Sequence, residues 1–360
     1  MRADTLSLER RARRAPMEVY VGLDVSLKRT ELCVVAASGK VLWRGAADTH
    51  PEMIAAALSR WRDSIVKLGL ETGSTTPWLA RGLKALGLPV VVMDARRASD
   101  ALMARPVKTD RADARALAEM LRTGRSGEVF VKSEESHRLK ALLLSRDQRV
   151  EDEAAGLRPD PWRASRPFGV RLPARVGTKR FDEAARAAVR DDDTLYACVA
   201  ALLEALGALE AQVAALDKRI RSIVGRSEAC WRLTSVPGVG PVTALAFLAT
   251  IEDPTRFGRP RDVGAYLGLT PKRYRSGERD VSGGISRQGD AMARHSLYEA
   301  ANCLLTTWGG RSALKSWGLG LAKRIGAKKA RVAVARKLAC LLLRLWRDGA
   351  HYREDAMRTA

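Results

Sequence analysis

Cysteine and histidine are scarce in this chain of 360 residues, which contains five cysteines and four histidines. The cysteines are isolated, with no C-x-x-C pair and no histidine nearby, so we expect neither a zinc site nor a disulfide framework. The sequence also lacks a run of about 18 apolar residues to span a bilayer, and its basic start lacks the apolar core of a signal peptide. These absences predict a cytoplasmic protein without a membrane partner.

Acidic residues are outnumbered as well. The chain has 41 Asp and Glu against 63 Lys and Arg, a formal net charge of +22, and the positive residues are spread along its whole length. A surplus of this size predicts a polyanionic partner, and nucleic acid is the polyanion that best fits it. The length suggests two or three domains.

After a basic arm at residues 1–16, the hydrophobic pattern of the first third alternates between that of strands and that of helices. Strand-like runs occupy residues 19–25, 30–37, 40–46, 66–71 and 88–94. The first three lie close together and predict an antiparallel meander. Helical patterns separate the later runs and continue from about residue 96 to 122, so the last two strands should add in parallel.

Four carboxylates occupy positions that could converge. Asp24 ends the first strand run, Glu71 ends the fourth, and Asp110 and Asp113 lie one turn apart on the later helix, where residues i and i+3 share a face. Clustered carboxylates repel one another unless cations hold them, and Mg²⁺ prefers such oxygen ligands. Two metal ions would suit phosphoryl-transfer chemistry, because one activates a nucleophile and the other stabilises the leaving oxygen.

Each acid also has a simpler interpretation. Asp24 could be a turn residue, Glu71 could cap the next helix, and the Asp110 and Asp113 pair could be a solvated face or a helix-entry pair. The joint arrangement favours a site, because open α/β sheets place their sites at the carboxyl ends of strands. Asp94 ends a strand run too, and we rank it lower, as a turn residue or a support for the ligands.

The middle of the chain differs in character. Residues 156–177 are rich in Pro, Arg and Gly and should be irregular. A heptad pattern with alternating spacings of four and three follows at Leu202, Leu206, Leu209, Val213, Leu216, Ile220 and Ile223. It predicts a coiled coil that joins chains, although a helix packed on its own domain has the same pattern.

Two features of the last third suggest contact with nucleic acid. Gly238 and Gly240 precede a helix and could present backbone N–H groups to a phosphate, as in helix-hairpin-helix modules, or simply form a tight turn between helices. Farther on, basic residues are interleaved with tyrosines and glycines, an arrangement that suits contact with a nucleic-acid backbone. The candidates there are Lys272, Arg273, Tyr274, Arg275, Arg279 and Arg287.

These motifs, in this order, resemble the DEDD transposases of bacterial insertion sequences of the 110/116/902 type, whose members include bridge-RNA-guided recombinases. The matching stretches are G-L-D-V-S, L-E-T-G, K-T-D-R-A-D-A, V-P-G-V-G-P-V-T and G-L-T-P-K-R-Y-R-S-G. The proline-rich segment near residues 150–177 departs from the helical continuation expected of the family.

The resemblance implies a RuvC-like (ribonuclease H-like) domain at residues 17–130, a helical coiled-coil region at 131–228 and a mainly helical transposase domain at 229–350. It implies that Asp24, Glu71, Asp110 and Asp113 bind Mg²⁺ and that Ser276 attacks DNA, with Ser282 and Ser286 as rivals. The expected partners are DNA, a guide RNA and further copies of the chain, as a homodimer or homotetramer near the bacterial nucleoid.

The leading hypothesis is therefore an RNA-guided DNA recombinase. A nuclease of the same fold, in which water attacks and Ser276 is structural, is one alternative. An inactive nucleic-acid-binding relative of a transposase is another, and the presence of all four acids argues against it.

Overall fold

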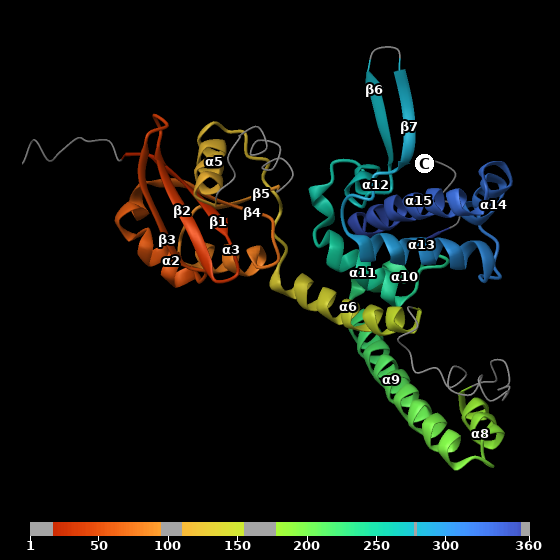
Figure 1. Cartoon of the computed structure of the whole chain (residues 1–360). Helices are drawn as coiled ribbons and strands as arrows, with labels where there is room; N and C mark the ends of the chain where they lie inside the picture. The colour runs from red at the N-terminus through yellow and green to blue at the C-terminus, as the bar shows by residue number, and fades with distance from the viewer. Residues whose placement is uncertain (1–16, 95–109, 155–177, 277–278, 354–360) are drawn as a thin grey trace, which may run out of the picture. The chain divides into compact units, whose positions relative to one another are not determined.

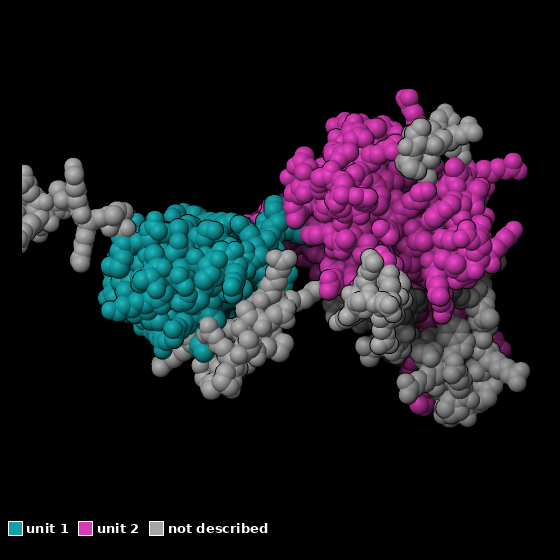
Figure 2. All heavy atoms as spheres, turned by 90° about the horizontal axis from the view of Figure 1, so that it is seen from above, with its two compact units in different colours: residues 1–132 teal, residues 133–360 magenta. Residues whose placement is uncertain are grey.

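The computed structural model describes residues 17–94, 110–154, 178–276 and 279–353 (Figure 1). Within these ranges, side chains are not described at positions 110–111, 148–154, 178–180, 274–276 and 279–282. The predicted basic arm, the helix at 96–109 and the segment at 156–177 lie outside the described residues. Contacts divide the chain into two compact units, residues 1–132 and 133–360, which Figure 2 shows in teal and magenta.

Unit 1 is built on a five-stranded sheet with the order β3-β2-β1-β4-β5. Its strands are β1 (Val19–Val25), β2 (Arg29–Ala36), β3 (Val41–Asp48), β4 (Ile65–Glu71) and β5 (Val90–Met93). The first three pair antiparallel, whereas β4 pairs parallel with β1 and β5 parallel with β4. The meander and the parallel addition predicted from the sequence are thus confirmed.

Helices cover both faces of this sheet, because side chains on successive strand residues point to opposite sides. On one face, Val21, Leu23 and their neighbours pack against α2 (Pro51–Ala57) and α3 (Thr76–Ala85), and a 3₁₀ turn at Ser59–Ser64 leads into β4. On the other face lies α5 (Asp110–Arg122), whose Leu117 and Leu121 pack against Met93 of β5 (Figure 1).

Two glycines let α5 approach the sheet closely. Gly22 of β1 and Gly69 of β4 are paired neighbours. A Cβ atom at Gly22 would lie 2.0 Å from the Ala114 carbonyl oxygen and 2.6 Å from the Ala118 nitrogen, and one at Gly69 would lie 2.6 Å from Leu121. No side chain fits between β1 and the helix backbone, so glycine at position 22 sets the distance between the two layers.

The direction of α5 follows from its contacts. At its carboxyl end, Arg122 donates a hydrogen bond to the carbonyl of Ala37, and the Ala37 N–H donates to the carbonyl of Glu18, the residue before β1. Ala114, near the amino end, lies over Gly22, farther along β1. The helix therefore runs antiparallel to β1, and its amino end lies at the carboxyl end of that strand.

The described part of unit 2 is helical apart from one hairpin. Its longer helices are α6 (Glu134–Ala154), α8 (Thr178–Ala188), α9 (Asp193–Arg226), α11 (Pro241–Ile251), α13 (Ala291–Thr306), α14 (Ala313–Ile325) and α15 (Ala327–Arg347). The shorter elements are α10 (Glu228–Thr234), a 3₁₀ turn at Pro254–Arg256 and α12 (Asp262–Tyr266). The core is centred on α11 and α15, and ion pairs from α6, Arg146 with Asp217 and Lys140 with Asp290, reach α9 and the start of α13.

The hairpin consists of β6 (Pro271–Ser276) and β7 (Arg279–Ile285), which pair antiparallel with Ser276 opposite Arg279. The two strands were not predicted, because this stretch was interpreted from its sequence only as basic and flexible. The alternation in R-Y-R-S and R-D-V-S on either side of a Ser-Gly turn signal is the pattern that could have identified them.

Helix α9 contains the predicted heptad pattern. Leu206 is buried against α8, and Ile220 is buried in the main core, whereas Leu209, Val213 and Leu216 between them are only half-buried. By length and composition α9 could cross a membrane, so our sequence-based exclusion of such a segment was too strict. One helix of this kind is weak evidence for a membrane protein. The role of α9 in joining two chains through its heptad pattern stays a prediction.

We predict that Gly22→Val lowers the stability of unit 1 by about 1–3 kcal/mol, because the new side chain must push α5 off the sheet. Differential scanning calorimetry of the full chain would measure the shift in the unfolding transition. The matched control is Gly207→Ala on α9, where a Cβ atom meets nothing within 4 Å. That change should stabilise the helix by roughly 0.5–1 kcal/mol. Equal transitions for wild type and Gly22→Val would contradict the packing argument.

Candidate active site and nucleic-acid interface

Asp24 and Glu71 occupy equivalent positions on neighbouring parallel strands. The last paired residues of β1 and β4 are Leu23 and Leu70, and the two acids follow them directly. Each acid lies two residues after a glycine covered by α5, so both carboxylates belong to the α5 face of the sheet. Adjacent strands lie roughly 4.8 Å apart, which brings the two carboxylates to one place.

The two acids line a common pocket of about 670 Å³ in unit 1. One wall is the turn after β1, which includes Ser26 and Lys28, and the opposite wall is the loop from Thr72 to Thr76 that leads into α3. The pocket therefore combines two carboxylates, several hydroxyl groups and the amino end of a helix, and these are groups that bind cations and phosphates.

Hydrogen bonds hold both walls in place. The hydroxyl of Thr49 donates to the Ser26 carbonyl at 2.8 Å and lies 2.9 Å from the hydroxyl of Thr30, which is fully buried. On the other wall, the buried Thr76 hydroxyl donates to the Glu71 carbonyl at 2.7 Å. The backbone that positions each acid is thus tied to a neighbouring element.

Asp113 lies in the first turn of α5, at the end of the helix that faces the carboxyl ends of β1 and β4. Asp110 is the first residue of the same helix, and its side chain lies outside the described ones. The structure thus brings Asp24 and Glu71 into one pocket and the amino end of α5 to the same edge of the sheet. Asp113 is not among the residues that line the pocket.

The donor set fits a hard divalent cation in chemistry, since Asp24 and Glu71 offer oxygen ligands from one face of the sheet. Among the described side chains, however, no three Asp, Glu, His or Cys residues come close enough to hold a metal ion together. Asp94 follows β5, where its N–H donates to the Gly127 carbonyl at 3.2 Å, and it does not line the pocket.

Ser276 is the last residue of β6, at the far end of a hairpin that rises from the helices of unit 2 (Figure 1). Its side chain, and that of its rival Ser282, lie outside the described ones. Ser286 lies at the base of the hairpin instead, where its N–H donates to the Thr270 carbonyl at 2.8 Å. Ser276 and Ser286 therefore lie at opposite ends of the hairpin.

The glycine turn joins α10 to α11. Gly238 has φ of +82°, in the left-handed region, and a Cβ atom there would lie 2.5 Å from the Ala300 carbonyl oxygen of α13. Both facts require glycine for the turn and its packing. Gly240, the N-cap residue of α11, faces open space, so of the two it is better placed for a ligand.

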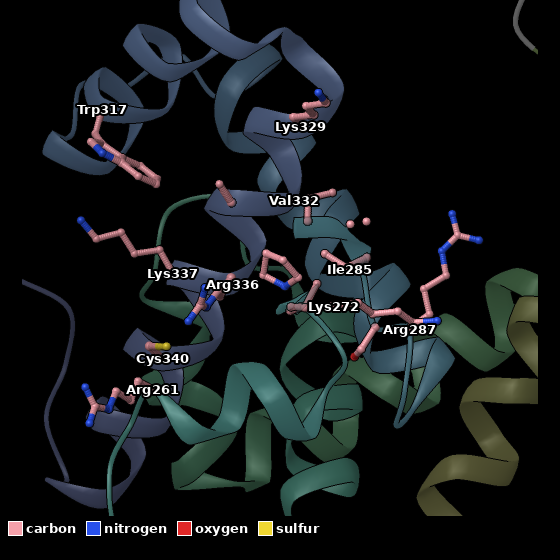
Figure 3. Close-up of a pocket in the computed structure, with 16 residues that line it drawn as sticks. Arg261, Lys272, Ile285, Arg287, Trp317, Lys329, Val332, Arg336, Lys337 and Cys340 are labelled. Atoms are coloured by element: carbon pink, nitrogen blue, oxygen red, sulfur yellow. The ribbon is translucent and has the colours of Figure 1, made fainter. Parts of the chain in front are cut away.

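Basic candidates surround the hairpin. Lys272 and Arg273 are exposed on β6, and Arg287 is exposed just beyond β7, whereas the side chains of Tyr274, Arg275 and Arg279 lie outside the described ones. Lys272 and Arg287 also line a cavity of about 990 Å³ at the base of the hairpin (Figure 3).

Helix α15 supplies the other side of this cavity, with residues that were not predicted from the sequence. Lys329, Val332, Arg336 and Cys340 recur there every three or four residues, the period of one helix face, and this was the signal that could have identified them. Burial raises the pKa of the Cys340 thiol although the nearby Arg336 lowers it, so the thiol stays protonated and is a poor nucleophile at neutral pH.

Two protein-family models match this chain, one over the carboxylate pocket of unit 1 and one over the glycine turn and hairpin of unit 2. A model for DEDD transposases of the IS110 type matches residues 21–157, which include Asp24, Glu71 and Asp113. A second model, described as "Transposase IS116/IS110/IS902 family", matches residues 230–316, which include the glycine turn and the hairpin.

Two known proteins are similar over long stretches. The transposase for insertion sequence element IS1111A of Coxiella burnetii is 28% identical over 360 residues, which cover 98% of this chain and 96% of that protein. The transposase for insertion sequence element IS1328 of Yersinia enterocolitica is 28% identical over 240 residues, covering 64% of this chain and 70% of that protein.

The fold and these similarities define the class of protein as an insertion-sequence transposase, which acts in DNA recombination. Within that class, the chain belongs to the IS110/IS116/IS902 family. The resemblance inferred from the sequence motifs is confirmed.

Proposed function

We propose that this transposase cuts and rejoins DNA strands with Ser276 as the nucleophile and with divalent cations, Mg²⁺ in the cell, held by Asp24, Glu71, Asp110 and Asp113. The observation that carries the proposal is the equivalent placement of Asp24 and Glu71 at the carboxyl ends of neighbouring strands, in one pocket. Two carboxylates this close repel each other, and a bound cation relieves that repulsion. Asp113 and Asp110 both belong to the first turn of α5, which lies at the carboxyl ends of β1 and β4.

In the proposed reaction, the Ser276 oxygen attacks a DNA phosphorus and the bond to a deoxyribose oxygen breaks. The chain is then joined to one DNA end as a phosphoserine, and the departing oxygen takes a proton. Bound cations would supply charge stabilisation and lower the pKa of the attacking hydroxyl. Because the covalent link conserves the phosphodiester energy, a free hydroxyl from another DNA end can reverse the step and rejoin the strands without ATP.

Contacts with nucleic acid would come from the hairpin and the glycine turn. Lys272, Arg273, Tyr274, Arg275, Arg279 and Arg287 would hold phosphates, and Gly238 and Gly240 would bring the turn close to a strand in the manner of a helix-hairpin-helix module. We further propose that a bridge RNA selects the DNA sites, and that the heptad helix α9 joins two or four chains.

A denaturing gel after incubation with cognate DNA and RNA separates this proposal from its two alternatives. A covalent protein–DNA adduct supports serine attack. Cleaved DNA ends without an adduct indicate a nuclease that uses water. A shift seen only under native conditions indicates a nucleic-acid-binding protein without catalytic activity.

We predict that Asp24→Asn, Glu71→Gln and Asp113→Asn each lower DNA cleavage by about 100-fold or more while the fold is retained, because a lost ligand removes charge stabilisation and no packing. Cleavage assays in Mg²⁺, with circular dichroism as the folding check, measure this. Asp94→Asn is the matched control, since Asp94 also follows a strand but lies outside the pocket lining. Wild-type cleavage by one of the three variants would remove that residue from the site.

We predict that Ser276→Ala binds DNA with unchanged affinity and forms no covalent adduct, because it lacks the attacking oxygen. Peptide mapping of the adduct in the wild type gives the position directly. In contrast, Lys272→Gln should still form the adduct, and its binding should depend less on salt by roughly one unit of slope. An adduct that persists in Ser276→Ala and maps to Ser282 or Ser286 would show that Ser276 is not the nucleophile.

We predict that Leu209→Asp with Val213→Asp gives a folded but smaller species, since burying unpaired carboxylates in a helix seam is costly. Light scattering after size-exclusion chromatography measures the mass. The matched control, Ala208→Asp with Ala215→Asp, adds the same charge at exposed positions of α9 outside the seam and should leave the mass unchanged. An unchanged mass for the seam variant would show that α9 does not join chains.

A further inference from the structure

The cavity at the base of the hairpin lies within unit 2 and is formed by parts far apart in the sequence. The ends of β6 and β7 supply one side, α14 supplies Trp317, and α15 supplies a row of side chains that face the same space (Figure 3). Its volume of about 990 Å³ lies at the upper end of the range of roughly 300–1,000 Å³ typical of pockets for small molecules. The matched family region ends at residue 316, before Trp317 and the whole of α15.

The charge of the lining is of one sign. Of the sixteen residues that line the cavity, six are basic and none is acidic. The basic residues are Arg261, Lys272, Arg287, Lys329, Arg336 and Lys337. Within the described residues, none of these six forms an ion pair. Asp262, which acts electrostatically on the lining residue Cys340, is itself paired with Arg259. The positive charge of the lining therefore exceeds the nearby negative charge and favours an anionic ligand.

Part of the cavity lining is apolar. Leu269, Ile285, Val332 and Cys340 form it beside the aliphatic stems of the basic residues. A free phosphate ion would be poorly matched to such a surface, because it would lose hydration without gaining partners there. The lining therefore fits a ligand that has an apolar body and a negative charge.

Trp317 gives the cavity a flat aromatic surface. Its side chain is 41% exposed, and Lys337 Nζ lies 4.6 Å from the centre of the indole ring. A stacking surface and a cation thus lie within the length of one nucleotide. Aromatic residues interleaved with basic ones are what bind an unpaired base and its phosphate.

Backbone hydrogen bonds hold the rim of the cavity at Ser286 and Arg287. Arg287 has φ of +54°, a left-handed conformation that is uncommon for a residue with a side chain. Its N–H donates to the Gly268 carbonyl at 3.1 Å, and the Ser286 N–H donates to the Thr270 carbonyl at 2.8 Å. These bonds hold the strained backbone in place, so the Arg287 side chain leaves the backbone at a defined point beside the cavity.

We infer that this cavity holds an unpaired nucleotide of a nucleic-acid strand, with its base stacked on Trp317 and its flanking phosphates bound by Lys329, Lys337 and Arg287. A base inside a duplex cannot reach a pocket, so the nucleotide is either single-stranded or flipped out of the stack. DNA and RNA share this chemistry. The site uses neither Ser276 nor the four acids. It rests on the proposed function only in the phosphate contact of Arg287, and it adds Trp317, Lys329 and Lys337, which that proposal does not use.

Fluorescence anisotropy of the full chain, in EDTA so that cleavage does not contribute, tests the inference with two fluorescein-labelled 20-nucleotide probes, oligo-dT and oligo-U. Trp317→Ala should weaken binding of at least one probe by roughly 10-fold, because a stacked base is lost. Trp317→Phe should restore most of the affinity. Lys329→Gln with Lys337→Gln should lower the salt slope by about 1.4 for two lost contacts to a single strand.

Matched controls lie outside the cavity in the same unit. Trp231→Ala removes a more exposed indole, and Lys218→Gln removes an exposed lysine of α9. Both should bind each probe within two-fold of wild type. The probe that loses affinity in Trp317→Ala identifies the source of the nucleotide as DNA, RNA or both.

Unchanged affinity of a folded Trp317→Ala chain for both probes would overturn the inference. So would complete competition by inorganic phosphate at millimolar concentration, because it would indicate a site for the anion alone. If Trp317→Ala does not fold, photocrosslinking of the wild type to 5-iodouracil probes decides: an adduct at Trp317 supports the inference, and adducts only elsewhere overturn it. These outcomes are independent of the gel for Ser276, since no DNA is cut.

Discussion

The close approach of α5 to the sheet is the constraint on which the arrangement of unit 1 depends. Because Gly22 has no side chain, the backbone of the helix lies directly on β1, with Ala114 and Ala118 in contact with the strand. This contact fixes the height of the helix and its position along the strand. It also brings the amino end of α5, with Asp113, to the edge of the sheet where Asp24 and Glu71 end their strands.

The same short pattern occurs twice in the sheet. G-L-D in β1 and G-L-E in β4 each place a glycine under the helix and a carboxylate two residues later on the same face. Because β1 and β4 are parallel and in register, the two patterns lie side by side. Packing and chemistry are therefore linked. Gly22 and Gly69 allow α5 to lie close to the sheet, and each fixes the face on which the acid two residues later is placed.

In unit 2 the apolar core and the basic cavity are formed by different sets of side chains. Apolar faces of α11, α13 and α15 form the core, while the opposite face of α15 combines with the hairpin base to form the basic cavity. One helix thus serves both purposes. Leu338 and Leu342 are buried in the core, Lys329 and Arg336 line the cavity, and Val332 and Cys340 lie at the boundary, where they contact both. The family similarity and the net charge of +22 agree with a surface that binds nucleic acid.

Local patterns in the sequence were sufficient for much of the fold. The strand runs, their alternation with helices and the pairing of the first three strands could be predicted, because hydrophobic period and turn residues act over a few neighbours. The positions of Asp24 and Glu71 at strand ends followed from the same patterns. The β6–β7 hairpin was not predicted, because its many basic residues leave few apolar side chains to show the two-residue period of a strand.

The amino-acid sequence by itself determined which segments of the first third are strands and helices, which strands end at Asp24 and Glu71, and how strongly positive the chain is. Only the tertiary structure decided that α5 runs antiparallel to β1, that Gly238 packs under α13, and that Trp317 shares a cavity with Lys272. The physical reason is that periodicity reports which face of an element is apolar, whereas the element that covers that face is chosen by packing among residues far apart in the chain.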